Sequence, residues 1–328
     1  MAGGQERELR RRIRTVESTK KITRAFELIA ASQIVRAQAR ISGARPYVAG
    51  VQNVLATVAG DATGAGRLIG TPEHAERVLL LVVVADRGLC GGYNSIALRT
   101  ADRLMRAGEA EGREYTLVTV GRKAQSYFRF RGRAIHRAFS QMTDRPTFAD
   151  ARAVAVELVG PFLDGEVDIV QLVSWRFHSA GVQSVATRQV LPLLPPPAPS
   201  TGAGTAAHPH DPDVAPGDGP SAAGFYDFEP LPEELLQLLV PQYAEAVVYQ
   251  ALLEASASEH TARQRAMSAA TENAEEFITT LRRVMNRVRQ DAVTTEIMEI
   301  VGGAEALRQA GPTGYVDIDD EHTEEQIA

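Results

Sequence analysis

The residues that most readily suggest chemistry form a glycine-rich segment, Ala85-Asp86-Arg87-Gly88-Leu89-Cys90-Gly91-Gly92-Tyr93. Glycine-rich turns between a strand and a helix can bind phosphate through backbone N–H groups. The spacing here matches neither G-x-G-x-x-G nor G-x-x-x-x-G-K-[ST], and no lysine follows that would reach a phosphate. We therefore interpret this segment as a structural turn with close backbone packing rather than as a nucleotide site.

Other reactive side chains do not combine into a catalytic site. Cys90 is the only cysteine, so it forms neither an internal disulfide nor a cysteine-based zinc site, and no nearby histidine would activate it. Glu259 and Arg263 are four residues apart, the spacing of a solvated ion pair on a helix. A Pro/Gly-rich stretch with the composition of a linker holds the residues His208, His210, Asp211 and Asp213. We expect no catalytic residue, no cofactor and no metal.

Composition excludes several classes of protein. The 328 residues are 44% hydrophobic and 23% charged, which is typical of a folded globular chain. The longest apolar run, Val78 to Ala85, is far shorter than the roughly 20 residues of a membrane span. We expect no signal peptide, because the arginine-rich start lacks an apolar region, and the single cysteine fits a reducing compartment. A net charge of −6 argues against a protein that coats nucleic acid.

The charge is unevenly distributed along the chain. Eleven basic residues lie between Arg7 and Arg45, whereas Asp317 to Glu325 holds six acids and no base. A basic helix can bind anionic lipid, nucleic acid or an acidic protein. Phe26 is the only aromatic residue in the basic stretch, which weakens the lipid and nucleic-acid interpretations. An acidic protein partner fits best.

The N-terminal segment from about Gln5 to Ala44 has the pattern of a long helix. It has neither proline nor glycine up to Ser42, and Gly43 and Pro46 predict its end. A helix this long needs a partner along its length. The apolar stripe consists of Leu9, Ile13 and Val16, extended by Ile22, Phe26, Ile29 and Ala30.

The middle of the chain alternates strands with helices. Arg77–Ala85 is a β-branched apolar run, typical of a strand buried on both faces. Further strands are predicted at Tyr115–Val120, Asp168–Phe177 and Gln189–Leu194. Helices are predicted at Asn94–Ala107, through Phe130, and at Phe148–Leu163. This order indicates an α/β domain, which we place at residues 75–195.

The last third begins with a Pro/Gly-rich stretch, from which we define a flexible insertion at 196–224. Pro232 opens a helix that we expect to be broken or kinked near Pro241 and to continue to Gln309. Residues 310–328 form an acidic tail that we expect to be disordered. A heptad seam on the long helix favours a left-handed coiled coil and comprises Phe277, Leu281, Val284, Val288, Asp291, Thr295 and Met298.

Two long terminal helices around one α/β domain suggest a single architecture. The N-terminal helix, placed at 1–58, and the C-terminal helix, placed at 232–309, pair as an antiparallel coiled-coil shaft. The fold class is α/β, with a Rossmann-like domain between the two shaft helices. The seam needs a partner, and the N-terminal stripe is the only internal candidate of comparable quality.

Three motifs closely resemble those of the gamma subunits of F-type ATP synthases. The first is the N-terminal stretch from Arg11 to Ser32, and the second is the Asp86–Asn94 turn. The third and most specific runs from Ala269 through Arg289-Gln290 to the segment Val293–Ala304. Together they cover nearly the whole chain, and the insertion resembles that of actinobacterial members.

The resemblance implies a function. In such a complex the shaft turns inside a ring of alternating alpha and beta subunits, and its foot binds the epsilon subunit and the membrane c-subunit ring. Rotation couples proton flow to ATP synthesis, while the nucleotide sites lie on the partners. The implied location is the cytoplasmic face of the bacterial cell membrane, as a peripheral protein without a membrane span and without nucleic acid.

The resemblance also implies which residues face partners. On the C-terminal helix these are Arg289, Gln290, Thr294 and Glu296, with Glu259 and Arg263 lower down. On the N-terminal helix they lie between Lys20 and Gln33 and include Lys21, Arg24 and Phe26. The chain departs from the family pattern at Phe26, Gln33 and Ser268, where methionine, a basic residue and lysine are usual.

Two other functions remain open from the residues alone. One is a free-standing coiled-coil adaptor with an α/β head, and the other is a nucleotide-using α/β enzyme. A stable homodimer that ignores the alpha/beta ring would favour the adaptor, and tight ATP binding at Gly91 and Gly92 would favour the enzyme.

Overall fold

The computed structural model describes residues 2–61, 66–70, 72, 75–194, 229–309 and 311. The chain divides into two compact units, one formed by Met1–Lys21 with Thr271–Ala328 and the other by Ile22–Ala270. Two long helices, α1 (Ala2–Asp61) and α5 (Pro232–Gln309), contribute to both units.

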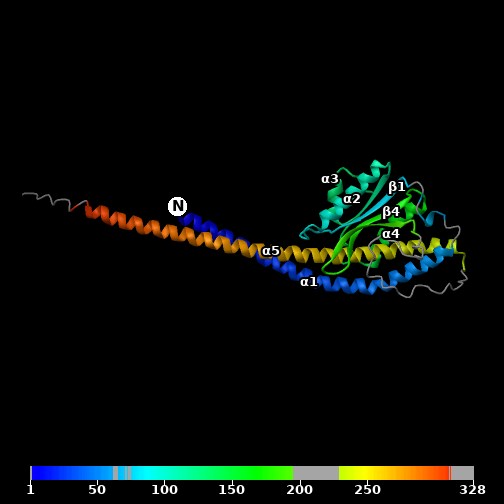
Figure 1. The fold of residues 1–328 in the computed structure, drawn as a ribbon, viewed down its shortest axis with the longest axis horizontal. Coiled ribbons are helices and arrows are strands. Elements are labelled where there is room, and N and C mark those ends of the chain that lie inside the picture. The colour runs from blue at the N-terminus through cyan, green and yellow to red at the C-terminus, as the bar shows by residue number, and fades with distance from the viewer. Residues whose placement is uncertain are drawn as a thin grey trace, which may run out of the picture. The chain divides into compact units, whose positions relative to one another are not determined.

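The larger unit contains a five-stranded sheet (Figure 1). The strands are β1 (Arg77–Val83), β2 (Glu114–Val120), β3 (Arg137–Phe139), β4 (Ile169–Phe177) and β5 (Gln183–Leu191). Their order is β3-β2-β1-β4-β5, in which β5 alone pairs antiparallel. The central strand β1 aligns Leu81 with Val118 of β2 and with Leu172 of β4. The remaining elements are a 3-10 turn (Gly66–Leu68), α2 (Tyr93–Ala110), α3 (Arg122–Phe130) and α4 (Phe148–Leu163).

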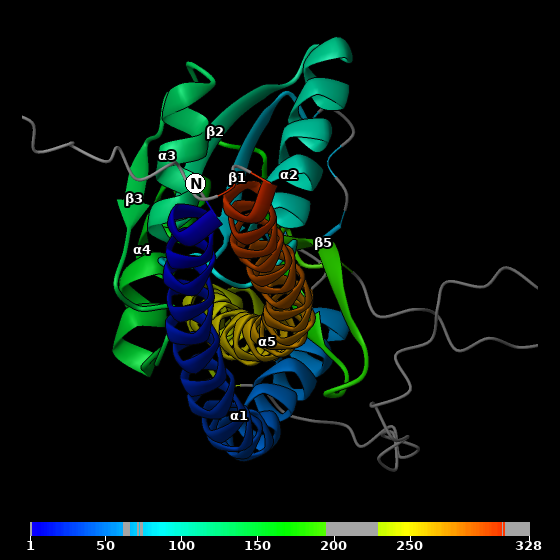
Figure 2. The same ribbon diagram turned by 90° about the vertical axis from the view of Figure 1, so that its left-hand side faces the viewer.

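Strand β1 has an uninterrupted apolar sequence because helices cover both faces of the sheet. Leu80 and Val82 pack with buried residues of α2 and α3, whereas Leu79, Leu81 and Val83 pack with those of α4 and α5. Figure 2 shows the same layers, with α2 and α3 on one side of the sheet and α4 on the other. Successive side chains of a strand point to opposite faces, so both faces require apolar residues here.

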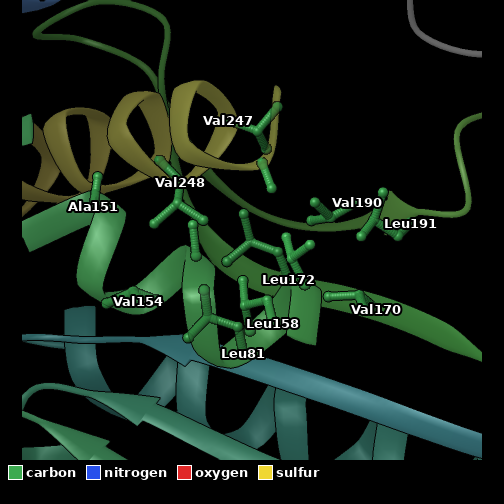
Figure 3. Close-up of a cluster of buried hydrophobic side chains, with 14 of the residues drawn as sticks. Leu81, Ala151, Val154, Leu158, Val170, Leu172, Val190, Leu191, Val247 and Val248 are labelled. Atoms are coloured by element: carbon green, nitrogen blue, oxygen red, sulfur yellow. The ribbon is translucent and has the colours of Figure 1, made fainter. Parts of the chain in front are cut away.

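The main core lies between the sheet, α4 and α5. Figure 3 shows Leu81 and Leu172 of the sheet facing Leu158 of α4, with Val247 and Val248 of α5 closing the cluster. All five side chains are at most 1% exposed. Burial of one such side chain contributes about 1.5–3 kcal/mol, so this cluster fixes α5 to the sheet.

Most predicted elements of this unit are present, with two corrections. The strand predicted at Gln189–Leu194 begins earlier and ends sooner, at Gln183–Leu191, because its antiparallel pairing with β4 extends along polar residues. Strand β3 was not predicted, since its three residues carry no periodic signal and are largely exposed.

The prediction that the N-terminal helix ends at Gly43 and Pro46 is wrong, because α1 continues through Pro46 to Asp61. Helix α5 is not broken at Pro241, and a kink there stays a prediction. A proline removes the hydrogen bond to the carbonyl four residues earlier, here that of Ser42 or Gln237. Both of those residues are exposed, so water can replace the lost donor while the buried faces of the helices stay packed.

In the smaller unit, α1 and α5 pack antiparallel. Ile13 is buried with Ile278 and Leu281, and Leu9, Val16 and Met285 pack around them. Ion pairs join Glu17 to Arg282 at 2.8 Å and Lys20 to Glu275 at 2.7 Å. Residue numbers therefore increase along α1 in the direction in which they decrease along α5, as in an antiparallel pair. The prediction that the N-terminal stripe partners the C-terminal helix is confirmed for these residues.

The register of the predicted seam is wrong. Phe277, Val284 and Met298 are 51%, 44% and 68% exposed, and of the predicted seam only Leu281 is fully buried. The buried heptad positions are instead Thr271, Ala274, Ile278 and Leu281, followed by the half-buried Met285, Val288 and Ala292. Two apolar stripes follow this helix, and the sequence pattern alone does not show which of them meets α1.

The predicted extension of the α1 stripe is wrong at Ile22, Phe26 and Ile29, which are exposed, and is confirmed at Ala30, which is 1% exposed. In the larger unit the face of α1 that packs has Glu27, Ala30, Ala37 and Ile41 buried. Ala37 belongs to the same buried cluster as Ala257 of α5, and small side chains of this kind let two helices pack closely. Small residues and a paired carboxylate give no apolar signal in the sequence.

Several predictions lie outside the described residues. These are the flexible insertion at 196–224, with its histidines and aspartates, and the acidic tail at 310–328 apart from Gly311. The five-part division of the chain into domains stays a prediction.

We predict that Gly121→Ala destabilises the larger unit by more than about 3 kcal/mol. Gly121 has φ +97°, and a Cβ there would overlap the carbonyl oxygen of Val84. Gly112→Ala is the matched control, since Gly112 has φ +88° with nothing within 4 Å, and it should cost only about 1 kcal/mol. Urea denaturation followed by circular dichroism measures the free energy of unfolding of both variants. An equal loss of stability in the two variants would contradict this explanation.

We predict that Ile278→Ala lowers the stability of the smaller unit by about 2–5 kcal/mol, because it leaves a cavity against Ile13. The neighbouring change Phe277→Ala should cost less than about 1 kcal/mol, since Phe277 is exposed. Hydrogen exchange of residues 9–16 and 274–285 reports the difference. A larger loss of stability in Phe277→Ala than in Ile278→Ala would support the seam that was predicted from the sequence.

Candidate functional site

The glycine-rich turn is held in shape by two of its own side chains. Asp86 accepts hydrogen bonds from the backbone N–H of Arg122 at 3.0 Å and of Gln141 at 2.8 Å, and from the hydroxyl of Thr143 at 3.1 Å. Asn94 accepts from the N–H of Ala85 at 2.9 Å. Asp86 therefore ties the carboxyl end of β1 to the start of α3 and to the loop that follows β3.

The same turn is attached to α5. The hydroxyl of Tyr93 donates to the carbonyl of Ala255 at 3.0 Å, and the guanidinium of Arg263 donates to the carbonyl of Gly88 at 3.3 Å. The Tyr93 ring stacks on Trp175 of β4, with ring centroids 5.3 Å apart, and the indole N–H donates to the Tyr93 carbonyl. Gly91 has φ +55°, which favours glycine, and a Cβ there would make an ordinary contact of 3.7 Å with that of Ala266.

A second loop is attached beside the turn. The carbonyl of Asp144 accepts from the hydroxyl of Ser256 at 3.0 Å and lies 3.3 Å from Nε2 of His260. We call the turn 86–94, the loop 141–144 and α5 residues 255–266 the turn–helix junction. Every residue of α5 from Ala251 to Thr261 is buried, so this part of the helix is enclosed on all sides.

Glu259 and Arg263 form a buried ion pair at the centre of the junction. Their atoms Oε1 and Nη2 are 2.6 Å apart, and the side chains are only 3% and 12% exposed. The interpretation as a solvated pair that faces a partner is therefore wrong, because Arg263 turns inward to reach the carbonyl of Gly88. Removing one member of such a pair costs about 3–5 kcal/mol, because the other charge stays buried without its partner.

Burial also shifts the pKa values of several side chains in the junction. It raises the pKa of Glu259, against the opposing charge of Arg263, and raises the pKa of Cys90 and of Tyr93. Burial lowers the pKa of His260, which favours the neutral imidazole. A thiol with a raised pKa is a poor nucleophile, so Cys90 serves as a packed small side chain, as predicted. Among the described residues, no three His, Cys, Asp or Glu side chains are grouped to hold a metal ion.

The residues predicted to face partners fall into two groups. Arg289, Gln290, Thr294 and Glu296 all lie exposed on α5 in the smaller unit. On α1, Lys21 is exposed, Phe26 is 38% exposed, and Gln33 is half-buried. Two predicted cations are engaged within the chain, Lys20 with Glu275, and Arg24 with both oxygens of the buried Glu27 at 2.9 Å.

Sequence reasoning missed the junction as a unit. It identified the glycine-rich turn, Glu259 and Arg263 separately, but nothing in the spacing places residues 175 positions apart in contact. The one available signal was the polar run Ser256 to Thr261 inside an apolar helix, which indicates buried partners rather than solvent.

Comparison with known proteins gives a consistent result. A family model described as ATP synthase matches residues 5–307. The ATP synthase gamma chain of Parafrankia sp. is 44% identical over 308 residues, covering 93% of this chain and 98% of the relative. That of Streptomyces coelicolor is 38% identical over 313 residues, covering 94% and 98%.

Solved structures show the same fold at low identity. A chain of the Euglena gracilis mitochondrial ATP synthase (OSCP/F1/c-ring) has a TM-score of 0.62 at 17% identity, covering 97% of this chain and 99% of that one. A chain of the Tetrahymena thermophila central stalk/c-ring structure has a TM-score of 0.55 at 22% identity, covering 76% and 99%. No helix among the described residues is long and apolar enough to cross a bilayer. The family match and the relatives lead to one conclusion: this chain belongs to the ATP synthase gamma chain family.

Proposed function

We propose that the chain is the central-stalk rotor of a proton-translocating F-type ATP synthase. The smaller unit turns inside a ring of alpha and beta subunits, and the larger unit binds the epsilon subunit and the c-subunit ring. The observation that carries this proposal is the family match over residues 5–307, together with relatives that are aligned over nearly their whole length.

The chain itself catalyses no reaction in this proposal. Its chemically capable groups are already engaged in structural contacts: Asp86 braces the turn, Glu259 pairs with Arg263, and His260 contacts Asp144. The glycine-rich turn contacts α5 at Ala266, and its spacing matches neither of the two phosphate-binding fingerprints. Nucleotide chemistry belongs to the partner subunits.

A rotor must transmit torque between its ends, and the turn–helix junction supports that role. Continuous helices carry the chain through both units, and the junction fixes α5 to the sheet through Tyr93, Arg263 and Asp144. Buried, hydrogen-bonded contacts of this kind resist sliding because breaking any one leaves an unpaired polar group. The larger unit therefore turns together with the helix that it encloses.

The exposed end of α5 supports contact with the catalytic subunits. Arg289, Gln290, Thr294 and Glu296 are free to meet a partner, and the apolar residues Val293 and Ile297 are 49% and 54% exposed beside them. An asymmetric rod presents different contacts to each of three sites, and this differential contact energy stabilises a different conformation in each. We place the complex at the cytoplasmic face of the bacterial membrane, with this chain peripheral to it.

Reconstitution tests the proposed assembly. Mixed with alpha and beta subunits, the full chain should form a complex with one copy per six-membered ring, as measured by native mass spectrometry. A homodimer that does not join the ring would support the adaptor alternative. Tight ATP binding to the isolated chain, lost in Gly91→Ala, would support the enzyme alternative.

We predict that Arg289→Ala and Gln290→Ala each lower the ATPase turnover of that complex about tenfold, equivalent to about 1.4 kcal/mol, with assembly retained. Both side chains are exposed, so the changes leave the fold intact. Arg103→Ala is the matched control, since it removes an exposed arginine from α2. Unchanged turnover in both variants would refute these contacts.

A further inference from the structure

Helix α3 presents a face without acidic residues to the solvent. Its buried residues, Ala124 and Phe128, pack against the sheet. At about 100° per residue, the exposed positions all lie within about 120° of one another, on the opposite side of the helix. They are Arg122, Lys123, Ser126, Arg129 and Phe130.

Arg131 extends this face beyond the end of the helix. Its guanidinium carbon lies 5.4 Å from the centroid of the Tyr127 ring. Tyr127 follows Lys123 by one turn, so the ring holds the Arg131 cation on the same side of the helix as Lys123. We call Arg122, Lys123, Arg129, Phe130 and Arg131 the α3 surface.

This part of the chain is strongly basic although the whole protein is acidic. The 23 residues from Gly121 to Thr143 contain six cations and no carboxylate, whereas the full chain has a net charge of −6. Two of the six cations are neutralised within the chain. Arg133 pairs with Glu109, and Arg137 pairs with Glu157. The other four cations belong to the α3 surface.

The four cations of the α3 surface have little compensating charge within the described part of the chain. Arg122 approaches the carboxylate of Asp86, but its Nε lies 3.9 Å from Oδ1. Among the residues that the structure describes, Lys123, Arg129 and Arg131 have no ion-pair partner. Unpaired like charges on one face repel one another and attract an anionic surface. The α3 surface therefore fits a polyanionic partner.

Phe130 indicates which polyanion fits. Its side chain is 88% exposed and lies on the same face as the cations. Segments that bind the surface of a bilayer combine Lys and Arg, which contact anionic headgroups, with a Phe or Trp ring that enters the headgroup layer. An acidic protein would be attracted by the cations alone. The preference for a membrane also rests on the proposed function, which places the larger unit on a ring that is embedded in a bilayer.

We propose that the α3 surface binds the headgroups of anionic phospholipids, with the Phe130 ring inserted between them. Each cation near an anionic bilayer strengthens binding about fivefold, and the attraction falls off within a Debye length of about 8 Å at physiological salt. Four cations and one ring therefore bind reversibly, and only where the membrane lies close. The larger unit thereby gains a contact with lipid in addition to its contact with the c-subunit ring.

Co-sedimentation of the full chain with vesicles tests the binding. At about 100 mM NaCl, we expect the chain to bind phosphatidylcholine vesicles that contain about 30% phosphatidylglycerol, and to bind pure phosphatidylcholine at least about tenfold more weakly. The combined change Arg122→Gln, Lys123→Gln, Arg129→Gln and Arg131→Gln should weaken binding to the anionic vesicles by at least about tenfold. Equal binding to both kinds of vesicle would overturn the proposal.

The smaller unit provides a matched control of equal charge. The combined change Arg7→Gln, Arg11→Gln, Arg14→Gln and Arg287→Gln removes four exposed arginines from α1 and α5. This variant should bind the anionic vesicles within about twofold of the wild type, because distant sites contribute independently. Equal losses in the two variants would show that binding follows net charge rather than the α3 surface, and the proposal would then be wrong.

The insertion of Phe130 has a readout of its own. Trp175 is the only tryptophan of the chain, so Phe130→Trp adds a single reporter to the α3 surface. Brominated phosphatidylcholine in the anionic vesicles should quench the fluorescence of this variant clearly more than that of the wild type. A variant that binds the vesicles without added quenching would show that another face meets the membrane, which contradicts the proposal.

A soluble polyanion separates a membrane from an acidic protein as the occupant. Phe130→Ser should weaken binding to the anionic vesicles about fivefold and leave the binding of polyglutamate unchanged. If both polyanions bound equally well and Phe130→Ser affected neither, an acidic protein would be the occupant and the proposal would fail. These measurements use the chain alone, so a chain that binds vesicles but does not join the alpha/beta ring would contradict only the proposed function. A chain that joins the ring but does not bind vesicles would contradict only this inference.

Discussion

The structure depends on the attachment of α5 to the glycine-rich edge of the central sheet. Helix α5 is buried on every side from Ala251 to Thr261, so its polar groups need partners, and among the described atoms of this stretch Ser258 Oγ and Glu259 Oε2 lack one. Tyr93 pairs with a carbonyl of α5, Arg263 with a carbonyl of the turn, and Asp144 with two side chains of α5. These contacts attach residues 255–263 of α5 to the carboxyl edge of the sheet within the larger unit.

The same junction gives the glycine-rich turn a structural role. Gly91 takes the positive φ of the turn, +55°, and lies next to Ala266 of α5. Asp86, which would repel a phosphate, instead receives backbone N–H groups of α3 and of the following loop. The residues of the glycine-rich turn thus stabilise the fold. The family match indicates that this fold is part of the central stalk of an ATP synthase.

Much of the fold could be predicted from the sequence, because its signals are strong and local. The run Arg77–Ala85 predicted a two-sided strand, and α4 has the predicted bounds Phe148–Leu163. What could not be predicted depends on long-range packing. The choice between two stripes on α5, the burial of Glu259 with Arg263 and the passage of both helices through prolines are all decided by neighbours distant in sequence. Of the candidate site residues, those at 289–296 are exposed as a contact surface must be, whereas Glu259 and Arg263 proved internal.

The central claim is that this chain turns within a ring of alpha and beta subunits while ATP is hydrolysed. Single-molecule rotation tests it most directly. A bead attached through Arg103→Cys on α2, in a complex with immobilised alpha and beta subunits, should rotate in one direction while ATP is hydrolysed. A bead that stays still or only fluctuates, while the same complexes hydrolyse ATP at the full rate, would contradict the account.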